Sequence, residues 1–252
     1  LSDDKYLKLG VIDDNDEPAS VCVTGVNENM GSIQWLFTDP DKREQGAGTF
    51  LMNGLAELGA AAGLEGLMAN YSAQAEDVDD FLTDSGFLVG TDEQIYRVPI
   101  SEIIYSGEMD AILERRSGNN TYDLKDPKGQ EFLKDLIKAH KLDVRMFEGV
   151  KAEFCSIYED PKTKQISAIF GSRFNENDLY VNYLISDKTV QGLCEVLGHL
   201  YDKITEEEIT RGDFVFSDRV GNALALIQKM FNINNLDEMV EPGRMQAIRL
   251  FA

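Results

Sequence analysis

The chain has 252 residues, and its 45 acidic and 24 basic side chains give a net charge of −21. Nucleic acids and anionic membranes are bound by Lys and Arg that neutralise phosphates, so this charge argues against both partners. Hydrophobic residues make up 43% of the chain, yet no apolar run approaches the roughly 20 residues of a membrane span. We therefore expect a soluble, cytoplasmic globular protein, whose acidity either aids solubility or suits a cationic amine.

Cysteine and histidine usage predicts no metal site and no disulfide framework. Cys22, Cys155 and Cys194 are far apart and stand in apolar surroundings, which is typical of reduced, buried thiols. His140 and His199 each fall inside a helical pattern without a neighbouring ligand residue, so we expect structural roles for both.

Three strands are predicted at the start of the chain. Lys5 to Ile12 and Ala19 to Val26 alternate between apolar and polar residues and are separated by a polar, proline-containing turn, which indicates an antiparallel hairpin. A further turn leads to a third strand, Ser32 to Thr38, which ends at Asp39 and Pro40. The pattern predicts a three-stranded meander.

A glycine-containing loop then opens a helix that we expect to span Glu44 to Ala62, with Gly63 as its C′ residue. The expected apolar face has three- and four-residue spacing and comprises Ala47, Phe50, Leu51, Leu55, Leu58 and Ala62. Helix starts have free N–H groups and a partial positive charge, and Gly46 and Gly48 would let the backbone approach a ligand closely. The layout predicts an anion site.

The rest of the first hundred residues continues the alternation of strands and helices. Leu64 to Ala69 is an apolar strand, Ala75 to Ser85 is a short acidic helix, and Ile95 to Ile100 is a strand that contains Pro99.

Composition changes from Ser101 onward, so we predict two domains, residues 1–100 and 101–252. The second half is expected to contain helices, three antiparallel strands, and then helix, strand, helix and strand. These elements are Glu108 to Arg115, Gly129 to Lys141, Lys151 to Tyr158, Gln165 to Phe174, Leu179 to Ile185, Thr189 to Ile204, Phe214 to Ser217, Asn222 to Phe231 and Met245 to Phe251.

The first hundred residues resemble the GCN5-related N-acetyltransferases (GNAT). The family's acyl-CoA site is a strand, a Pro and an R/Q-x-x-G-x-G/A loop opening a helix, and this chain has Pro40, Arg43, Gly46 and Gly48 at those spacings. Asn70 after the next strand and the later Gly86-Phe87 pair are similar to the family's N-(x)n-GF segment. The remainder of the chain is similar only in the order of its elements.

The resemblance implies an α/β (α+β) protein with a mixed, mainly antiparallel sheet flanked by helices, present as two copies in tandem. GNAT proteins have a strand and two helices before the hairpin, whereas this chain starts at the hairpin. We therefore expect the first domain to be incomplete and the second to be a degenerate GNAT-like domain.

The resemblance also implies acetyl transfer from acetyl-CoA to an amine, with no metal. Backbone N–H groups of the loop would hold the pyrophosphate, and the end of the preceding strand would pair with the pantetheine arm. The expected cofactor-binding residues are Leu36, Phe37, Thr38, Arg43, Gln45, Gly46, Ala47, Gly48, Thr49 and Asn70.

The proton-handling groups of the family are less evident. Where many members have a Tyr that protonates the leaving thiolate, this chain has Leu82, and where a Glu often serves as base it has Gln34. Tyr71 is the nearest candidate acid, and a half-buried structural tyrosine is the alternative.

In the second half, the corresponding loop, residues 185–192, has a single glycine at another offset and Asp187 at the helix entrance. Asp187 would itself cap the free N–H groups, so we expect one CoA per chain, bound in the first domain. The competing reading is a catalytically silent CoA-binding or structural tandem GNAT module. The sequence does not select the acceptor amine, and it is compatible with a homodimer.

Overall fold

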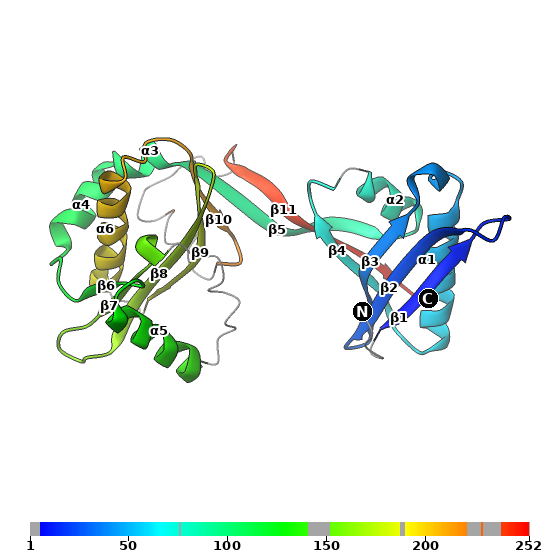
Figure 1. Ribbon diagram of the computed structural model, residues 1–252, viewed down its shortest axis with the longest axis horizontal. Helices are drawn as coiled ribbons and strands as arrows, with labels where there is room; N and C mark the ends of the chain where they lie inside the picture. The colour runs from blue at the N-terminus through cyan, green and yellow to red at the C-terminus, as the bar shows by residue number, and fades with distance from the viewer. Residues whose placement is uncertain are drawn as a thin grey trace. The chain divides into compact units, whose positions relative to one another are not determined.

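The computed structural model describes residues 6–75, 77–140, 152–186, 190–220, 228 and 238–251 (Figure 1). The chain divides into two units, and the first is discontinuous in sequence. Unit 1 comprises Leu1–Glu93 and Pro242–Ala252, and unit 2 comprises Gln94–Glu241. The C-terminal end of the chain therefore belongs with its N-terminal part.

The elements of unit 1 are β1 (Leu7–Ile12), β2 (Pro18–Asn27), β3 (Met30–Thr38), the short 3-10 helix η1 (Pro40–Lys42), α1 (Ala47–Ala61), β4 (Gly66–Ser72) and α2 (Val78–Asp84). Two strands, β5 (Leu88–Pro99) and β11 (Val240–Leu250), contribute residues to both units. In unit 1 the strand order is β1-β2-β3-β4-β11, and β3 and β4 run parallel whereas the other pairs are antiparallel.

The elements of unit 2 are α3 (Ile100–Ile104), α4 (Gly107–Arg115), β6 (Thr121–Asp123), α5 (Pro127–His140), the 3-10 helix η3 (Ala152–Phe154), β7 (Ser156–Glu159), β8 (Ile166–Asn175), β9 (Asp178–Ser186), α6 (Val190–Glu206) and β10 (Asp213–Ser217). Its strand order is β5-β10-β9-β8-β7-β6, with only β9 and β10 parallel among these pairs. The predicted fold class, a mixed and mostly antiparallel sheet flanked by helices, is confirmed.

Most predicted elements are present, and several differ. The stretch predicted as a strand from Lys151 to Tyr158 begins instead as η3, α3 and β6 were not predicted, and β5 and β11 begin seven and five residues before the predicted strands. β4 extends to Ser72, so Asn70 and Tyr71 lie inside the strand, because β11 pairs with β4 along this length. The predicted helix Asn222 to Phe231 and the predicted cap Asp187 lie outside the described residues.

The predicted apolar face of α1 is partly wrong. Phe50 is 71% exposed and Leu58 is 48% exposed. The buried face instead comprises Gly48, Leu51, Met52, Leu55, Ala56 and Gly59. Small residues on this face let the helix lie close to its neighbours: a Cβ at Gly59 would come within 2.9 Å of the Phe251 ring. Large side chains alone therefore did not mark the inward face.

The predicted C-terminal end of α1 is confirmed. Gly63 has φ +79 and donates its N–H to Ala60 O, while Leu64 donates to Gly59 O, both at 3.0 Å. This pair of bonds is a Schellman motif, which needs a left-handed residue at C′.

Each unit has its own core. In unit 1, α1 packs on β1 to β4, and its core includes Cys22, Met52, Leu67, Leu82 and Ala247. In unit 2, α3, α4 and α6 cover one face of the sheet, and α5 packs by the other around Cys155 and Ile157. The three cysteines are free and buried, as predicted, and burial raises the pKa of Cys22 and of Cys155 to about 11.

Candidate functional site

A groove of about 650 Å³ lies at the start of α1 in unit 1. Its size is within the usual range for small-molecule sites. It is lined by the end of β3, the loop before α1, the first turn of α1 and one side of α2: Leu36, Thr38, Lys42, Arg43, Glu44, Gly46, Ala47, Gly48, Thr49, Asp77, Val78, Asp80, Phe81 and Asp84.

The start of α1 has no side-chain cap. Gly46 is the N-cap residue, with φ +82, and its carbonyl accepts the first helical bond from Phe50 N–H at 2.9 Å. The N–H groups of Ala47, Gly48 and Thr49 precede this bond, so they have no partner within the helix. They are therefore free to donate to an anion, and the helix dipole favours negative charge there.

The loop before α1 supplies one free positive charge. Lys42 Nζ is held by Asp13 Oδ2 at 2.8 Å and by Glu17 Oε2 at 3.1 Å. Arg43 instead donates from Nε to Thr38 O at 3.4 Å, and no carboxylate of the described part of the chain forms an ion pair with it. Arg43 is thus the cation available to a ligand phosphate.

The edge of β3 opens beside this groove. β3 and β4 pair only from Met30 with Gly66 to Ile33 with Ala69, whereas β11 pairs with the other side of β4 from Gly66 to Ser72. Residues 34–38 of β3 have β2 on one side and no described strand on the other. The strands therefore diverge and leave a backbone edge that an extended ligand can pair with.

Backbone direction shows which groups face the open edge. Asp39 N–H donates to Ala19 O on β2 at 3.0 Å. Because hydrogen-bonding groups alternate along a strand, Leu36 and Thr38 direct theirs away from β2. The Leu36 and Thr38 side chains also line the groove.

The opposite wall of the groove is acidic. Asp77, Asp80 and Asp84 of the α2 segment line it, together with Glu44 of the loop. The acidic helix was predicted from the sequence, but its carboxylates were not assigned to the site. They oppose the anion-binding character of the α1 start, so the position of a bound phosphate depends on Arg43 and the free N–H groups.

The remaining predicted site residues lie outside the groove. Phe37 is 43% exposed and stacks on Trp35, with ring centroids 5.8 Å apart. The Gln45 side chain bonds to Asp41 O at 3.0 Å. Asn70 accepts a hydrogen bond from Gln246 Nε2 at 3.2 Å and lines a second, polar pocket.

Tyr71, the candidate acid, also lines this second pocket. Its hydroxyl donates to Asp79 Oδ1 of α2 at 2.7 Å. Burial raises the pKa of Tyr71 above its usual value, and the Asp79 carboxylate raises it further. In this arrangement Tyr71 keeps its hydroxyl proton and donates it in the hydrogen bond to Asp79.

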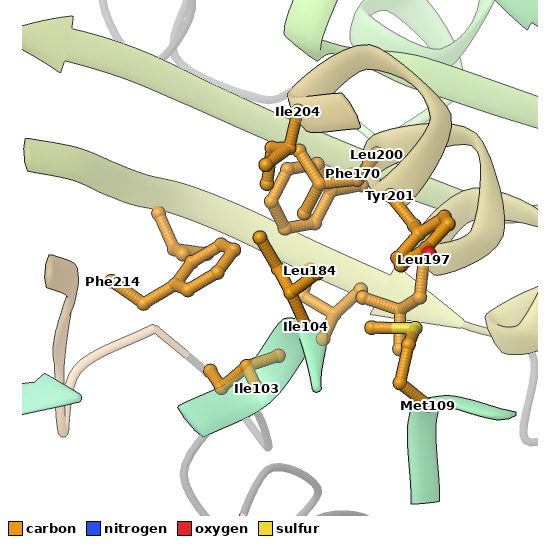
Figure 2. Close-up of a pocket in the computed structure, with 11 residues that line it drawn as sticks. Ile103, Ile104, Met109, Phe170, Leu184, Leu197, Leu200, Tyr201, Ile204 and Phe214 are labelled. Carbon is orange, nitrogen blue, oxygen red and sulfur yellow. The ribbon is translucent and has the colours of Figure 1, made fainter. Parts of the chain in front are cut away.

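An apolar cavity in unit 2 is a poor candidate for a ligand site. Figure 2 shows it between α6, α3 and the sheet, with Phe170, Leu184, Leu197 and Phe214 among the residues around it. Its volume is about 30 Å³, which leaves room for water and for no cofactor. His199, also in unit 2, is half-buried, and the partial loss of solvent lowers its pKa.

The described residues contain no cluster of three His, Cys, Asp or Glu side chains able to hold a metal ion. Nor is any helix among them long and apolar enough to cross a membrane.

No protein-family model matches the sequence, and no curated protein matches it. Solved structures with similar folds include the ribosomal-protein-S18-alanine N-acetyltransferase of Escherichia coli, with 21% identity over 40% of this chain and 64% of that protein, TM-score 0.33. The PaiA N-acetyltransferase of Thermoplasma acidophilum, solved with coenzyme A, has 16% identity over 34% of this chain and 54% of that protein, TM-score 0.33.

A GCN5-related N-acetyltransferase from Kribbella flavida matches 96% of this chain and 60% of its own length, with 14% identity and a TM-score of 0.46. The chain thus covers between 54% and 64% of the length of each of these three proteins. At these identities and TM-scores, the likeness does not assign the chain to a family.

Proposed function

We propose that this protein is a GNAT-type N-acetyltransferase, which transfers an acetyl group from acetyl-CoA to an amine. One observation carries the proposal: in unit 1, a single groove joins an uncapped helix start to the open edge of a neighbouring strand. The first feature suits a pyrophosphate and the second suits an extended amide-containing arm. In CoA, a pyrophosphate is followed directly by a pantetheine arm that contains amides.

The proposed roles follow this layout. Arg43 and the backbone from Gln45 to Thr49, which includes Gly46, Ala47 and Gly48, would hold the pyrophosphate. Leu36 and Thr38 would pair with the pantetheine arm, and Phe37 would hold the strand between them through its pairing with β2. Asn70, one residue beyond the last β3–β4 pair, would contact the arm near its thioester end.

The reaction needs two proton losses from the acceptor ammonium. After the first, the nitrogen lone pair attacks the thioester carbonyl carbon, a C–N bond forms, the C–S bond breaks and its electron pair goes to sulfur. The second proton leaves nitrogen as the amide forms, and one proton reaches the thiolate. Tyr71 is the proposed donor to sulfur, and it would first have to release Asp79.

The division of labour is also a proposal. Residues 1–100 would supply most of the GNAT domain that holds acetyl-CoA, with the end of β11 completing its sheet, and residues 101–252 would contain a degenerate GNAT-like domain in tandem. One CoA would bind per chain, because the loop at residues 185–192 has no glycine pair like that of Gly46 and Gly48.

The test is incubation of the full chain with acetyl-CoA and a panel of amines while free thiol is followed. We expect thiol release that depends on the amine and saturates with it. Tight CoA binding without turnover on any amine would contradict transferase activity and favour a catalytically silent CoA-binding module.

A further inference from the structure

A second pocket, of about 450 Å³, lies in unit 1 on β4, β11 and the middle of β5. It is lined by Asn70, Tyr71, Ser72, Glu93, Gly243 and Arg244. Its charged groups are one carboxylate, that of Glu93, and one guanidinium, that of Arg244. We call it the β4–β11 pocket.

The pocket opens on the face of the sheet away from α1. Leu67 and Ala69 are in the core under α1, so the alternating residues Asn70 and Ser72 face the other way. Arg244 is directly opposite Ser72 in the antiparallel β4–β11 pair and shares that face. A ligand here approaches the strand divergence from the side opposite α1.

The pocket begins where the strands diverge. Ile33 and Ala69 form the last β3–β4 pair, and Asn70 is the next residue of β4. A CoA arm that follows β3 from Thr38 to Gln34 extends about 13 Å, at ~3.3 Å per residue. Its thioester would then reach the gap beside Asn70. This step rests on the proposed function of the groove.

The two charges of the pocket are close but are not joined by a hydrogen bond. Glu93 Oε2 lies 3.9 Å from Arg244 Nε, beyond hydrogen-bond range, and the two side chains are 20% and 49% exposed. Each therefore keeps bonding capacity for a ligand. A carboxylate pairs well with an ammonium, and a guanidinium pairs with a carboxylate through two parallel N–H bonds.

We propose that the β4–β11 pocket binds the acceptor, and that the acceptor is a small zwitterion with an ammonium next to a carboxylate, such as a free α-amino acid. Glu93 holds the ammonium and accepts its first proton, and Arg244 holds the carboxylate. The nitrogen lone pair then attacks the thioester carbon from this side, and C–S cleavage leaves the electron pair on sulfur. Tyr71 protonates the thiolate, and the second nitrogen proton replaces the one that Tyr71 gives up.

The test compares α-amino acids with the corresponding amino-acid amides, with acetyl-CoA and the full chain, following thiol release. We expect kcat/KM at least tenfold higher for the amino acids. Arg244→Gln should remove this preference by raising KM for the amino acid, whereas Arg244→Lys should keep part of it. Glu93→Gln should lower kcat for both, and Glu57→Gln, an exposed change on α1, should alter neither.

Outcomes for the pocket and for the groove can be told apart. Equal turnover of acids and amides, unchanged in Arg244→Gln, would overturn the inference and leave the transferase proposal standing. Calorimetry of an amino acid against the CoA-bound chain tests the pocket without turnover. Absence of saturable, Arg244-dependent binding would overturn the inference, and absence of CoA binding would overturn the function of the groove instead.

Discussion

At the residue scale, the loop that begins the groove is fixed by one lysine. Lys42 joins η1 to the β1–β2 turn through Asp13 and Glu17. The hydrogen bond from Lys42 lowers the pKa of Asp13 to about 2 from its ordinary value of 3.8. The side chain of Lys42 thus positions the loop, and Arg43 stays available to the ligand.

The ion pair predicts a defined pH dependence. Because the folded-state pKa of Asp13 is depressed, its contribution to the free energy of unfolding is present above about pH 4 and is lost as the pH falls towards 2. In urea unfolding, Asp13→Asn should therefore be less stable than wild type at pH 6, and the difference should shrink as the pH falls from 4 towards 2. Asp16→Asn, in the same turn, is the matched control, since Asn tolerates the φ of +61 there.

Gly48 has a packing role that its sequence position did not indicate. The sequence indicates close backbone approach to a ligand at this position, yet Gly48 is also buried. An added Cβ would come within 3.1 Å of the Phe81 ring and 3.3 Å of Thr38 Oγ1. A Gly48 substitution consequently perturbs packing between α1 and α2 as well as ligand binding, so Ala47 is the better position for a test.

At the element scale, α1 and α2 form the walls of the groove. The burial of α1 predicts different costs for two similar truncations. Met52 is 0% exposed, so Met52→Ala should lower the free energy of unfolding by about 2–5 kcal/mol. Leu58 is 48% exposed, so Leu58→Ala should cost less than about 1 kcal/mol. Urea unfolding measures both, and the reverse order would contradict the observed burial of α1.

The carboxylates of α2 predict a gain of affinity. Asp80 lines the groove opposite the free N–H groups of α1. Removing its charge with Asp80→Asn should tighten CoA binding about two- to fivefold at low salt, and less at high salt, because such repulsion is screened. Weaker binding by Asp80→Asn would instead identify Asp80 as a direct ligand contact. Glu57→Gln serves as the control for an equal change of net charge.

Local sequence patterns predicted where helices and strands form better than they predicted which of these elements pack or pair with one another. The apolar and polar alternation of β1 and β2 and the glycine at the end of α1 are short-range signals. The strands and the helix end predicted from them are confirmed. The predicted inward face of α1 is partly wrong, because Gly48 and Gly59 are buried by neighbours distant in sequence. The continuation of β4 through Asn70 and Tyr71 accompanies its pairing with β11, more than 160 residues later, and no local pattern encodes that pairing.

At the scale of the whole molecule, unit 1 is closed by the end of the chain. Ala247 of β11 is 0% exposed and lies opposite Ala69 of β4. Ala247→Asp buries a carboxylate there and should speed amide hydrogen exchange in β4, residues Gly66–Ser72. Leu250→Asp, at a position 69% exposed on the same strand, should change exchange far less. Equal exchange of β4 in both variants would contradict the observed pairing.

The start of α1 is the proposed site for the pyrophosphate of CoA. Calorimetric titration of the full chain with CoA tests it most directly, with Ala47→Glu and Ala47→Gln as a matched pair that differ in charge. Glu is tolerated in the first turn of a helix, but its carboxylate would repel the diphosphate. We predict one equivalent of CoA per chain, affinity at least tenfold lower in Ala47→Glu, and near-unchanged affinity in Ala47→Gln. Two equivalents, or equal affinities in the two variants, would contradict the account.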